Sequence, residues 1–295
     1  MLALNLSPLI RQLRPHQWAK NTLLFVPILA AHRGSDITGV TQVSIAFVAF
    51  SLLASCVYII NDWIDIEADQ KHPTKRLRPL AAGTLSKSTA GGLLMVLVAS
   101  SAALCIVVGS WSFAAYLGLY LAINILYSSK GKKLLGLDVV CLALLYTLRI
   151  LAGGAAAGVA VSFWLLTFSS FFFLSLALLK RTSELVLTGD IAGSHRRAYA
   201  VGDIEVIVSL GTSASLVSGL VLLLYLNSPV VAALYPHPER LWFLLPVLFY
   251  WKLRIWILAR RGDISQDPVA FALRDGLTWI LLAFAAALVV LASWS

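Results

Sequence analysis

Nine long apolar runs, separated by short charged or Pro/Gly-rich breaks, make up most of this chain. An α-helix needs about 20 mostly apolar residues to cross the hydrocarbon core of a bilayer. The runs are too long and too uniformly apolar for the alternating strands of a closed barrel. They predict membrane-spanning helices near residues 20–33, 41–63, 89–109, 113–128, 135–157, 162–180, 205–226, 241–258 and 276–293. We interpret the chain as an all-α polytopic membrane protein, with residues 1–295 in one transmembrane domain.

Composition excludes several other classes of protein. Charged residues make up 13% of the chain and hydrophobic residues 59%, whereas soluble domains carry about 25% charged residues. A soluble enzyme, a disordered chain and a nucleic-acid-binding module are therefore excluded, although the net charge is +9. The three cysteines lie in separate apolar runs without metal-ligand spacing, which indicates small buried hydrophobic side chains.

The positions of the basic residues predict the orientation in the membrane. Two basic residues, Arg33 and Arg240, fall in the connections expected on the outer side. Eighteen of the 23 fall before the first run or in alternate connections: Arg11, Arg14, Lys20, Lys71, Lys75, Arg76, Arg78, Lys87, Lys130, Lys132, Lys133, Lys180, Arg181, Arg196, Arg197, Arg260, Arg261 and Arg274. Because Lys and Arg concentrate on the cytoplasmic side, we expect a cytoplasmic N-terminus, an outer C-terminus and a place in the plasma (inner) membrane.

Three carboxylates follow the second run directly. In helical geometry Asp62, Asp65 and Asp69 lie within a sector of about 60°, while Glu67 lies on the opposite side. Such close carboxylates repel one another unless a cation lies between them. Mg²⁺ prefers oxygen ligands and commonly binds a few carboxylates together with substrate phosphates. The segment predicts a magnesium site, and a solvated acidic helix end is the alternative.

A basic stretch comes next in the chain. Lys75, Arg76 and Arg78 are close enough in sequence to reach the same site, and Arg binds phosphate oxygens through its planar fork. Alone, such a loop indicates no more than topology or lipid contact. Beside the carboxylates, it predicts a site for a diphosphate.

Other charged residues lie at or inside the predicted spans. Lys180, Arg181 and Glu184 end the sixth span, where a surface ion pair of Lys180 with Glu184 is the alternative to a site role. Arg149 lies inside the fifth span, on nearly the same helix face as Asp138, and an intramembrane Arg favours a site role. Arg14, Trp18 and Lys20 form an amphipathic entry, for which interfacial anchoring is the alternative. The small residues 153–158 indicate close helix packing.

The spacing from Asn61 through Asp62 and Asp65 to Asp69 resembles the first aspartate-rich motif of the UbiA-type intramembrane prenyltransferase superfamily. Within it, the chain is similar to the decaprenyl-phosphate phosphoribosyltransferase branch. That similarity rests on the segments 14–21, 61–83, 148–154, 180–185 and 272–275, which extend over nearly the whole chain.

The resemblance implies nine helices around a central cavity, open here to the cytoplasmic side, and a magnesium-dependent transferase. The implied reaction moves 5-phosphoribosyl from phosphoribosyl pyrophosphate to a polyprenyl (decaprenyl-like) phosphate, releases pyrophosphate and yields a cell-wall arabinose precursor. The expected metal ligands and catalytic residues are Asp62, Asp65 and Asp69. The expected substrate-binding residues are Asn61, Lys75, Arg76, Arg78, Lys20, Arg149, Lys180, Arg181, Glu184 and Arg274.

One departure from the family pattern separates the alternatives. Relatives that use prenyl diphosphates carry a second aspartate pair near the end of the sixth helix, where this chain has Lys180, Arg181 and Glu184. This disfavours a prenyltransferase that moves an isoprenoid to an aromatic or other small acceptor. A transporter or lipid flippase would favour broken helices in two matched halves, which the sequence does not have. The sequence leaves open whether the protein forms a homo-oligomer.

Overall fold

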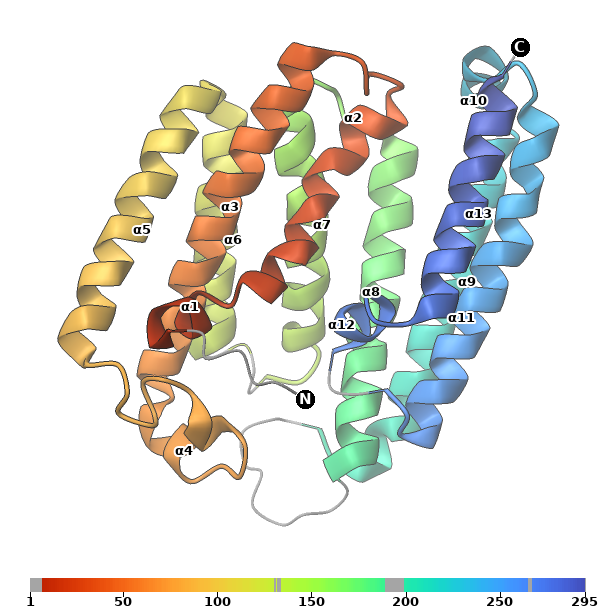
Figure 1. The fold of residues 1–295 in the computed structure, drawn as a ribbon. Coiled ribbons are helices and arrows are strands. Elements are labelled where there is room, and N and C mark those ends of the chain that lie inside the picture. Colours follow the sequence, from red (N-terminus) through yellow and green to blue (C-terminus); the bar gives the residue numbers. More distant parts are fainter. Residues whose placement is uncertain (1–6, 130, 132–133, 189–198, 265–266, 295) are drawn as a thin grey trace. The chain divides into compact units, whose positions relative to one another are not determined.

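The computed structural model describes residues 7–129, 131, 134–188, 199–264 and 267–294, and within them all regular structure is helical. Lys130, Lys132, Lys133, Arg196 and Arg197, used above for orientation, lie outside the described residues. Eight described helices are long and apolar enough to cross a membrane. They are built on α3 (Ile37–Ile64), α5 (Lys87–Val108), α6 (Trp111–Ser129), α7 (Leu137–Ala157), α8 (Phe163–Thr188), α9 (Ile204–Leu226), α11 (Leu244–Arg261) and α13 (Gly276–Ser293), as Figure 1 shows. They confirm the second to ninth predicted spans.

The first predicted span, residues 20–33, differs from the expectation. It is divided between a 3₁₀-helix, η1 (Pro15–Phe25), and the short α2 (Val26–Ala30). Pro15 begins η1, and Pro27 lies in the first turn of α2, where a missing backbone N–H is tolerated. The chain turns after Ala30, so this segment does not form a long α-helix.

The chain divides into two compact units. The first comprises residues 1–129 and 148–161, and the second comprises residues 130–147 and 162–295. The continuous helix α7 contributes residues 137–147 to the second unit and its remaining residues to the first. A single domain therefore stays a prediction.

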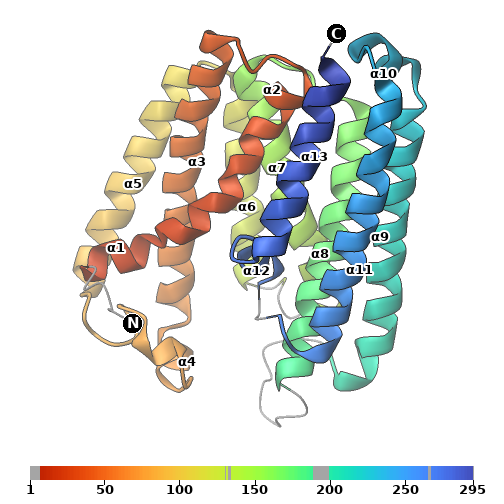
Figure 2. The same ribbon diagram turned by 45° about the vertical axis from the view of Figure 1, so that its right-hand side comes forward.

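Helix α3 forms the core of the first unit. Asp36 caps its N-terminus by accepting a hydrogen bond from the Gly39 N–H at 3.0 Å. α3 packs against α5, α6, η1 and the short α1 (Pro8–Leu13), and α3 and α5 run side by side in Figures 1 and 2. Its buried face combines apolar residues with Ser51, Ser55 and Asp62.

Polar contacts join the N-terminal segment to α3. Ser55 accepts a hydrogen bond from Trp18 Nε1 at 3.0 Å and donates one to the Leu13 carbonyl at 2.8 Å. One turn away, Asn21 Nδ2 donates to Ser51 Oγ at 3.0 Å. Irregular backbone at membrane depth is tolerated where the protein buries it and satisfies its polar groups. These bonds therefore explain how a 3₁₀ segment is held beside a membrane-spanning helix.

A glycine of α7 lets the same segment approach closely. A Cβ added at Gly153 would lie 1.9 Å from the Leu24 carbonyl oxygen, and one at Gly154 would lie 2.8 Å from the Val159 carbonyl oxygen. Only glycine fits where two backbones come so near. The packing role predicted for the small residues of this helix is confirmed at Gly153.

A compact connection follows α3 in the first unit. It contains α4 (Ile66–Gln70) and the 3₁₀ turn η2 (Lys75–Leu77), and α4 packs against η2. Arg11 of α1 donates to the Leu77 carbonyl oxygen at 3.0 Å. The connection and the N-terminal segment therefore lie at the same end of α3, which is the end that carries Asp62.

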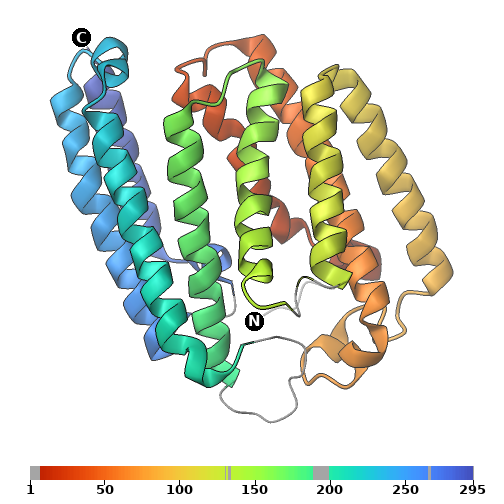
Figure 3. The ribbon, with the colours of Figure 1, turned by 180° about the vertical axis from the view of Figure 1, so that it is seen from behind.

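The second unit is built on α8, α9 and α11, with α8 beside α9 as seen from behind in Figure 3. Around these lie α13 and the short elements η4 (Val201–Asp203), α10 (Pro229–Leu234), η5 (Pro238–Phe243) and α12 (Pro268–Ala272). Gly211 of α9 leaves room for the Trp256 ring, to which an added Cβ would approach within 2.3 Å. Trp256 Nε1 in turn donates to Ser175 Oγ at 3.3 Å.

A buried lysine lies inside this second bundle. Lys252 of α11 is 4% exposed and donates to the Ser215 carbonyl oxygen at 2.6 Å and to Ser218 Oγ. Its ammonium group also lies 5.5 Å from the centre of the Phe172 ring. Among the described residues these are its partners, and none of them is a carboxylate.

Candidate active site

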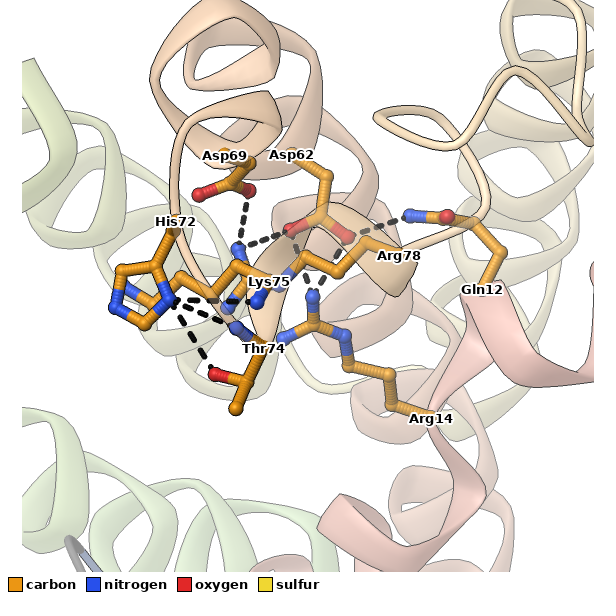
Figure 4. A network of polar contacts seen from close by, with 8 residues as sticks. All are labelled: Gln12, Arg14, Asp62, Asp69, His72, Thr74, Lys75 and Arg78. Atoms are coloured by element: carbon orange, nitrogen blue, oxygen red, sulfur yellow. Dashed lines mark hydrogen bonds and ion pairs between the residues drawn. The ribbon is translucent and has the colours of Figure 1, made fainter.

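Asp62 lies in the last turn of α3, and donors from two other segments surround its carboxylate (Figure 4). Arg14 Nη2 reaches both Asp62 oxygens at 2.6 Å, Arg78 Nη1 reaches Oδ1 at 3.0 Å, and Gln12 Nε2 reaches Oδ2 at 2.9 Å. The Asp62 side chain is 2% exposed. Three segments far apart in sequence therefore meet at one buried carboxylate.

Arg78 connects this carboxylate to a second one. Its Nη1 also donates to Asp69 Oδ2 at 2.7 Å, and Asp69 of α4 is 1% exposed. The four charged groups of Arg14, Asp62, Arg78 and Asp69 balance formally. Hydrogen bonds to charged partners are stronger than neutral ones, and paired charges tolerate burial. Each buried carboxylate of this cluster is therefore paired with a guanidinium.

The turn after α4 is closed by an imidazole. His72 Nδ1 accepts hydrogen bonds from the backbone N–H groups of Thr74 at 3.3 Å and Lys75 at 3.4 Å. In this arrangement Nδ1 carries no proton. Lys75 is half-buried and Arg76 is exposed, so both flank the cluster in the first unit.

The carboxylates fit Mg²⁺ by their chemistry, since hard oxygen donors are its preferred ligands. In the described part of the chain, however, no three His, Cys, Asp or Glu side chains converge as a metal site. Both Asp62 oxygens already accept hydrogen bonds from arginine, so this residue does not fit as a ligand in the observed arrangement. Asp65 is half-buried at the C-terminal cap of α3, and it fits by both chemistry and exposure.

Arg149 occupies a separate position within the first unit. Its Nε donates to Asn21 Oδ1 at 2.9 Å and its Nη2 to Tyr120 Oη at 3.2 Å. The guanidinium also lies 5.4 Å from the centre of the Phe50 ring. Phe50 precedes Asp62 by 12 residues on α3, which corresponds to about 18 Å along the helix axis. Arg149 therefore contacts α3 about three turns before Asp62.

In the second unit, Arg181 is buried and paired. It donates through Nε to Asp138 Oδ2 and through Nη1 to Glu184 Oε2, and its side chain is 1% exposed. Asp138 Oδ1 accepts a further hydrogen bond from Tyr199 Oη at 2.8 Å. These two ion pairs give Arg181 a structural role in the second unit, and its predicted phosphate contact stays a prediction.

Tyr199 also accepts a hydrogen bond from the Gly136 N–H at 3.0 Å. Burial, together with the hydrogen bond to Asp138, raises the pKa of the Tyr199 hydroxyl to about 12. The hydroxyl therefore remains a donor throughout the physiological pH range.

The remaining predicted residues lie in both units. Asn61 and Lys20 are half-buried in the first, whereas in the second Lys180 is half-buried and Arg274 is exposed. Next to Arg274, Asp275 caps α13 through the Thr278 N–H at 2.9 Å and binds Arg254. The ion pair with Arg254 lowers the pKa of the Asp275 carboxyl. Substrate contacts of the four predicted residues stay predictions.

Four residues of these clusters were not foreseen in their observed roles: Gln12, Arg14, Asp138 and Tyr199. Arg14 was identified as part of an N-terminal segment, but nothing in its spacing indicated a bond to a residue 48 positions later. Asp138 was noted for its helix face relative to Arg149, yet its partner is Arg181. Gln12 and Tyr199 carry no sequence signal that we can identify.

The aspartates of α3 and α4 and the basic turn beside them lie within the range matched by a known family. The family model for the UbiA prenyltransferase family matches residues 22–277. The chain belongs to the UbiA prenyltransferase family. The resemblance to this family predicted from the aspartate spacing is confirmed.

The chain is similar in sequence to several known proteins. The chain is 37% identical over 290 residues to the uncharacterized protein y4nM of Sinorhizobium fredii, covering 96% of this chain and 55% of y4nM. It is 35% identical over 268 residues to the nodulation protein NoeC of Azorhizobium caulinodans, covering 89% and 86%. It is 39% identical over 184 residues to the decaprenyl-phosphate phosphoribosyltransferase of Corynebacterium glutamicum, covering 61% and 55%. The chain thus spans about half the length of two of these relatives.

A solved structure shares the fold. The structure of a UbiA homologue from Archaeoglobus fulgidus bound to GPP and Mg²⁺ superposes with a TM-score of 0.71 at 17% identity. The match covers 96% of this chain and 100% of that one.

Proposed function

We propose that this UbiA-family enzyme transfers 5-phosphoribosyl from phosphoribosyl pyrophosphate to a polyprenyl phosphate and releases pyrophosphate. The observation that carries the proposal lies at the end of α8. There Glu184, the one acidic residue of the described stretch 180–188, binds Arg181, and so does the nearby Asp138. These carboxylates neutralise a buried cation, which disfavours a second magnesium site of the kind that a prenyl diphosphate would use.

Similarity to phosphoribosyltransferases supports the same choice. The Corynebacterium glutamicum enzyme carries this activity in its name, and so does a Mycolicibacterium smegmatis relative that is 35% identical over 223 residues. Each match covers only part of both chains, so the substrate is proposed on these grounds together with the charge pattern.

The proposed chemistry breaks the bond between ribose C1 and the diphosphate and forms a bond from C1 to an oxygen of the lipid phosphate. The lipid phosphate is already an anion, so its attack needs no general base. Positioning and electrostatic stabilisation therefore carry most of the proposed acceleration. Lys75, Arg76 and Arg78 would bind diphosphate oxygens, and Asn61 would line the same end of α3.

Mg²⁺, when bound, would neutralise charge that develops on the leaving diphosphate. Asp65 would hold it, since this residue follows the end of α3, is half-buried and supplies hard oxygen donors. Lys20 is the proposed contact for the lipid phosphate in the first unit.

The test uses purified full-length protein with labelled phosphoribosyl pyrophosphate, Mg²⁺ and decaprenyl phosphate. We expect label to enter the organic phase, and we expect Asp65→Asn to abolish this transfer while the protein still folds. Glu67→Gln is the matched control. Glu67 is exposed in α4, the short helix that begins directly after Asp65, and it lies outside the proposed site.

A prenyltransferase acting on a prenyl diphosphate is the second candidate, favoured by the structural neighbour bound to GPP. If label stays in the aqueous phase while geranyl diphosphate is consumed with an aromatic acceptor, this second candidate replaces the first.

A further inference from the structure

Arg14 and Arg78 meet on one carboxylate, yet each uses only one nitrogen to do so. Arg14 binds Asp62 through Nη2, and Arg78 binds Asp62 and Asp69 through Nη1. A guanidinium has five N–H donors. Within the described ranges, neither arginine donates a hydrogen bond from Nε or from its other Nη. Their side chains are 19% and 27% exposed, and the Arg14 guanidinium lies 5.0 Å from the centre of the Tyr58 ring.

The carboxylates below the two guanidiniums are far more buried than the arginines. Asp62 and Asp69 are 2% and 1% exposed. Gln12, which is 0% exposed, adds a neutral donor that fixes the Asp62 carboxylate from a third side. Two like charges repel strongly outside bulk water, so a carboxylate between them is what holds the guanidiniums close together. The buried carboxylates therefore fix the positions of the two guanidinium groups.

The backbone of Arg14 is consistent with a positioned side chain. Its φ of 51° and ψ of 55° place it in the left-handed region, and Pro15 follows it. The left-handed region is strained for a residue other than glycine. Such strain persists where surrounding contacts over-determine the conformation, and it is common at functional sites. The bonds from Arg14 to Asp62 are contacts of this kind.

We propose that Asp62 is a positioning residue that holds Arg14 and Arg78 as a paired receptor for the diphosphate of the water-soluble substrate, and that Asp62 does not ligate the metal. This proposal extends the proposed function, and it rests on the same assumption that the site binds a diphosphate. Phosphate oxygens match the planar fork of arginine, and two forks side by side offer several donors to adjacent phosphoryl groups. Arg14 thereby becomes a substrate contact together with Arg78.

Binding of inorganic pyrophosphate to full-length protein in detergent and EDTA tests this directly, because no metal takes part. Isothermal titration calorimetry should show about tenfold weaker binding for Arg14→Gln and for Arg78→Gln, the size expected for one lost charge-assisted hydrogen bond. Asp62→Asn should weaken binding by a similar factor, because the guanidiniums lose their fixed positions. Arg33→Gln is the control, since Arg33 forms a comparable ion pair with Asp36 before the first residue of α3.

A double variant separates positioning from independent binding. If Asp62 acts by positioning the two arginines, the combination of Asp62→Asn with Arg14→Gln should lose less pyrophosphate affinity than the sum of the two single losses, because one of the arginines that Asp62 holds is already removed. The Mg²⁺ concentration for half-maximal turnover should be the same in Asp62→Asn and wild type. Fully additive losses in pyrophosphate affinity would overturn the proposal.

Two further results would also overturn it. One is an Asp62→Asn protein that binds pyrophosphate as wild type does without metal but needs more Mg²⁺ for turnover, because Asp62 would then be a metal ligand. The other is an Asp62→Asn protein that binds decaprenyl phosphate more weakly than wild type does but has lost no affinity for pyrophosphate. If Asp62→Asn does not fold, Arg14→Lys replaces it: the charge remains, the fork is lost, and wild-type affinity would contradict the proposal. These binding results do not depend on which diphosphate the enzyme turns over.

Discussion

Arg181 of α8 binds Asp138, which lies 43 residues earlier at the beginning of α7, and both side chains are 1% exposed. Glu184 completes the pair with a second carboxylate. A buried arginine thus takes its partners from two helices of the second unit. Removing one partner of a buried ion pair leaves the other charge buried without compensation.

Replacing Arg181 by Gln should therefore destabilise the protein by about 3–5 kcal/mol. The apparent melting temperature in detergent measures this, with Arg260→Gln as the matched control because Arg260 is exposed in the last turn of α11. A melting temperature equal to that of the control would show that the buried pair contributes nothing to stability.

Tyr199→Phe should lower stability at neutral pH, because it removes the hydrogen bond to Asp138. The pKa of Tyr199 is raised in the folded protein to about 12 from an ordinary value near 10. This contribution is fully present below pH 10 and is lost as the pH rises from 10 to 12. The difference in melting temperature between Tyr199→Phe and wild type should therefore shrink between pH 10 and 12, and a difference independent of pH would refute the raised pKa.

Gly153→Ala should be strongly destabilising. The new methyl group would lie 1.9 Å from the backbone oxygen of Leu24, and backbone cannot rotate away as a side chain can. Overpacking of this kind costs about 1–3 kcal/mol or more. Gly92→Ala on α5 is the control, since nothing lies within 4 Å of its Cβ position and alanine is the better helix former. Equal melting temperatures for the two variants would contradict the close approach of η1 to α7.

Lys252→Met should leave the free energy of unfolding unchanged or raise it. The buried ammonium has polar partners but no carboxylate among the described residues, and apolar replacements of buried charges are often neutral or stabilising by about 1–4 kcal/mol. Ser218 keeps its own hydrogen bond to the Ser215 carbonyl oxygen at 2.9 Å. Thermal unfolding of Lys252→Met beside wild type checks this. A fall in melting temperature would indicate that Lys252 stabilises the bundle.

Hydropathy was sufficient to predict eight of the spans, because any helix that crosses a bilayer must be long and apolar. Side-chain partners were less predictable. The pairing of Arg14 with Asp62, and of Asp138 with Arg181, depends on how distant segments pack, and helical periodicity describes only one helix at a time. The aspartate spacing therefore located the polar end of α3 correctly, but it could not distinguish a carboxylate held by two arginines from one open to a cation.

The 3₁₀ winding of η1 increases the length over which this segment extends. A 3₁₀-helix rises about 2.0 Å per residue and an α-helix about 1.5 Å. The 11 residues of η1 and the five of α2 therefore extend over about 30 Å, which equals the thickness of the hydrocarbon core. The same residues wound entirely as α-helix would extend over about 24 Å. Tighter coiling thus makes this segment about 6 Å longer than an α-helix of the same residues, and α3 accepts its polar groups.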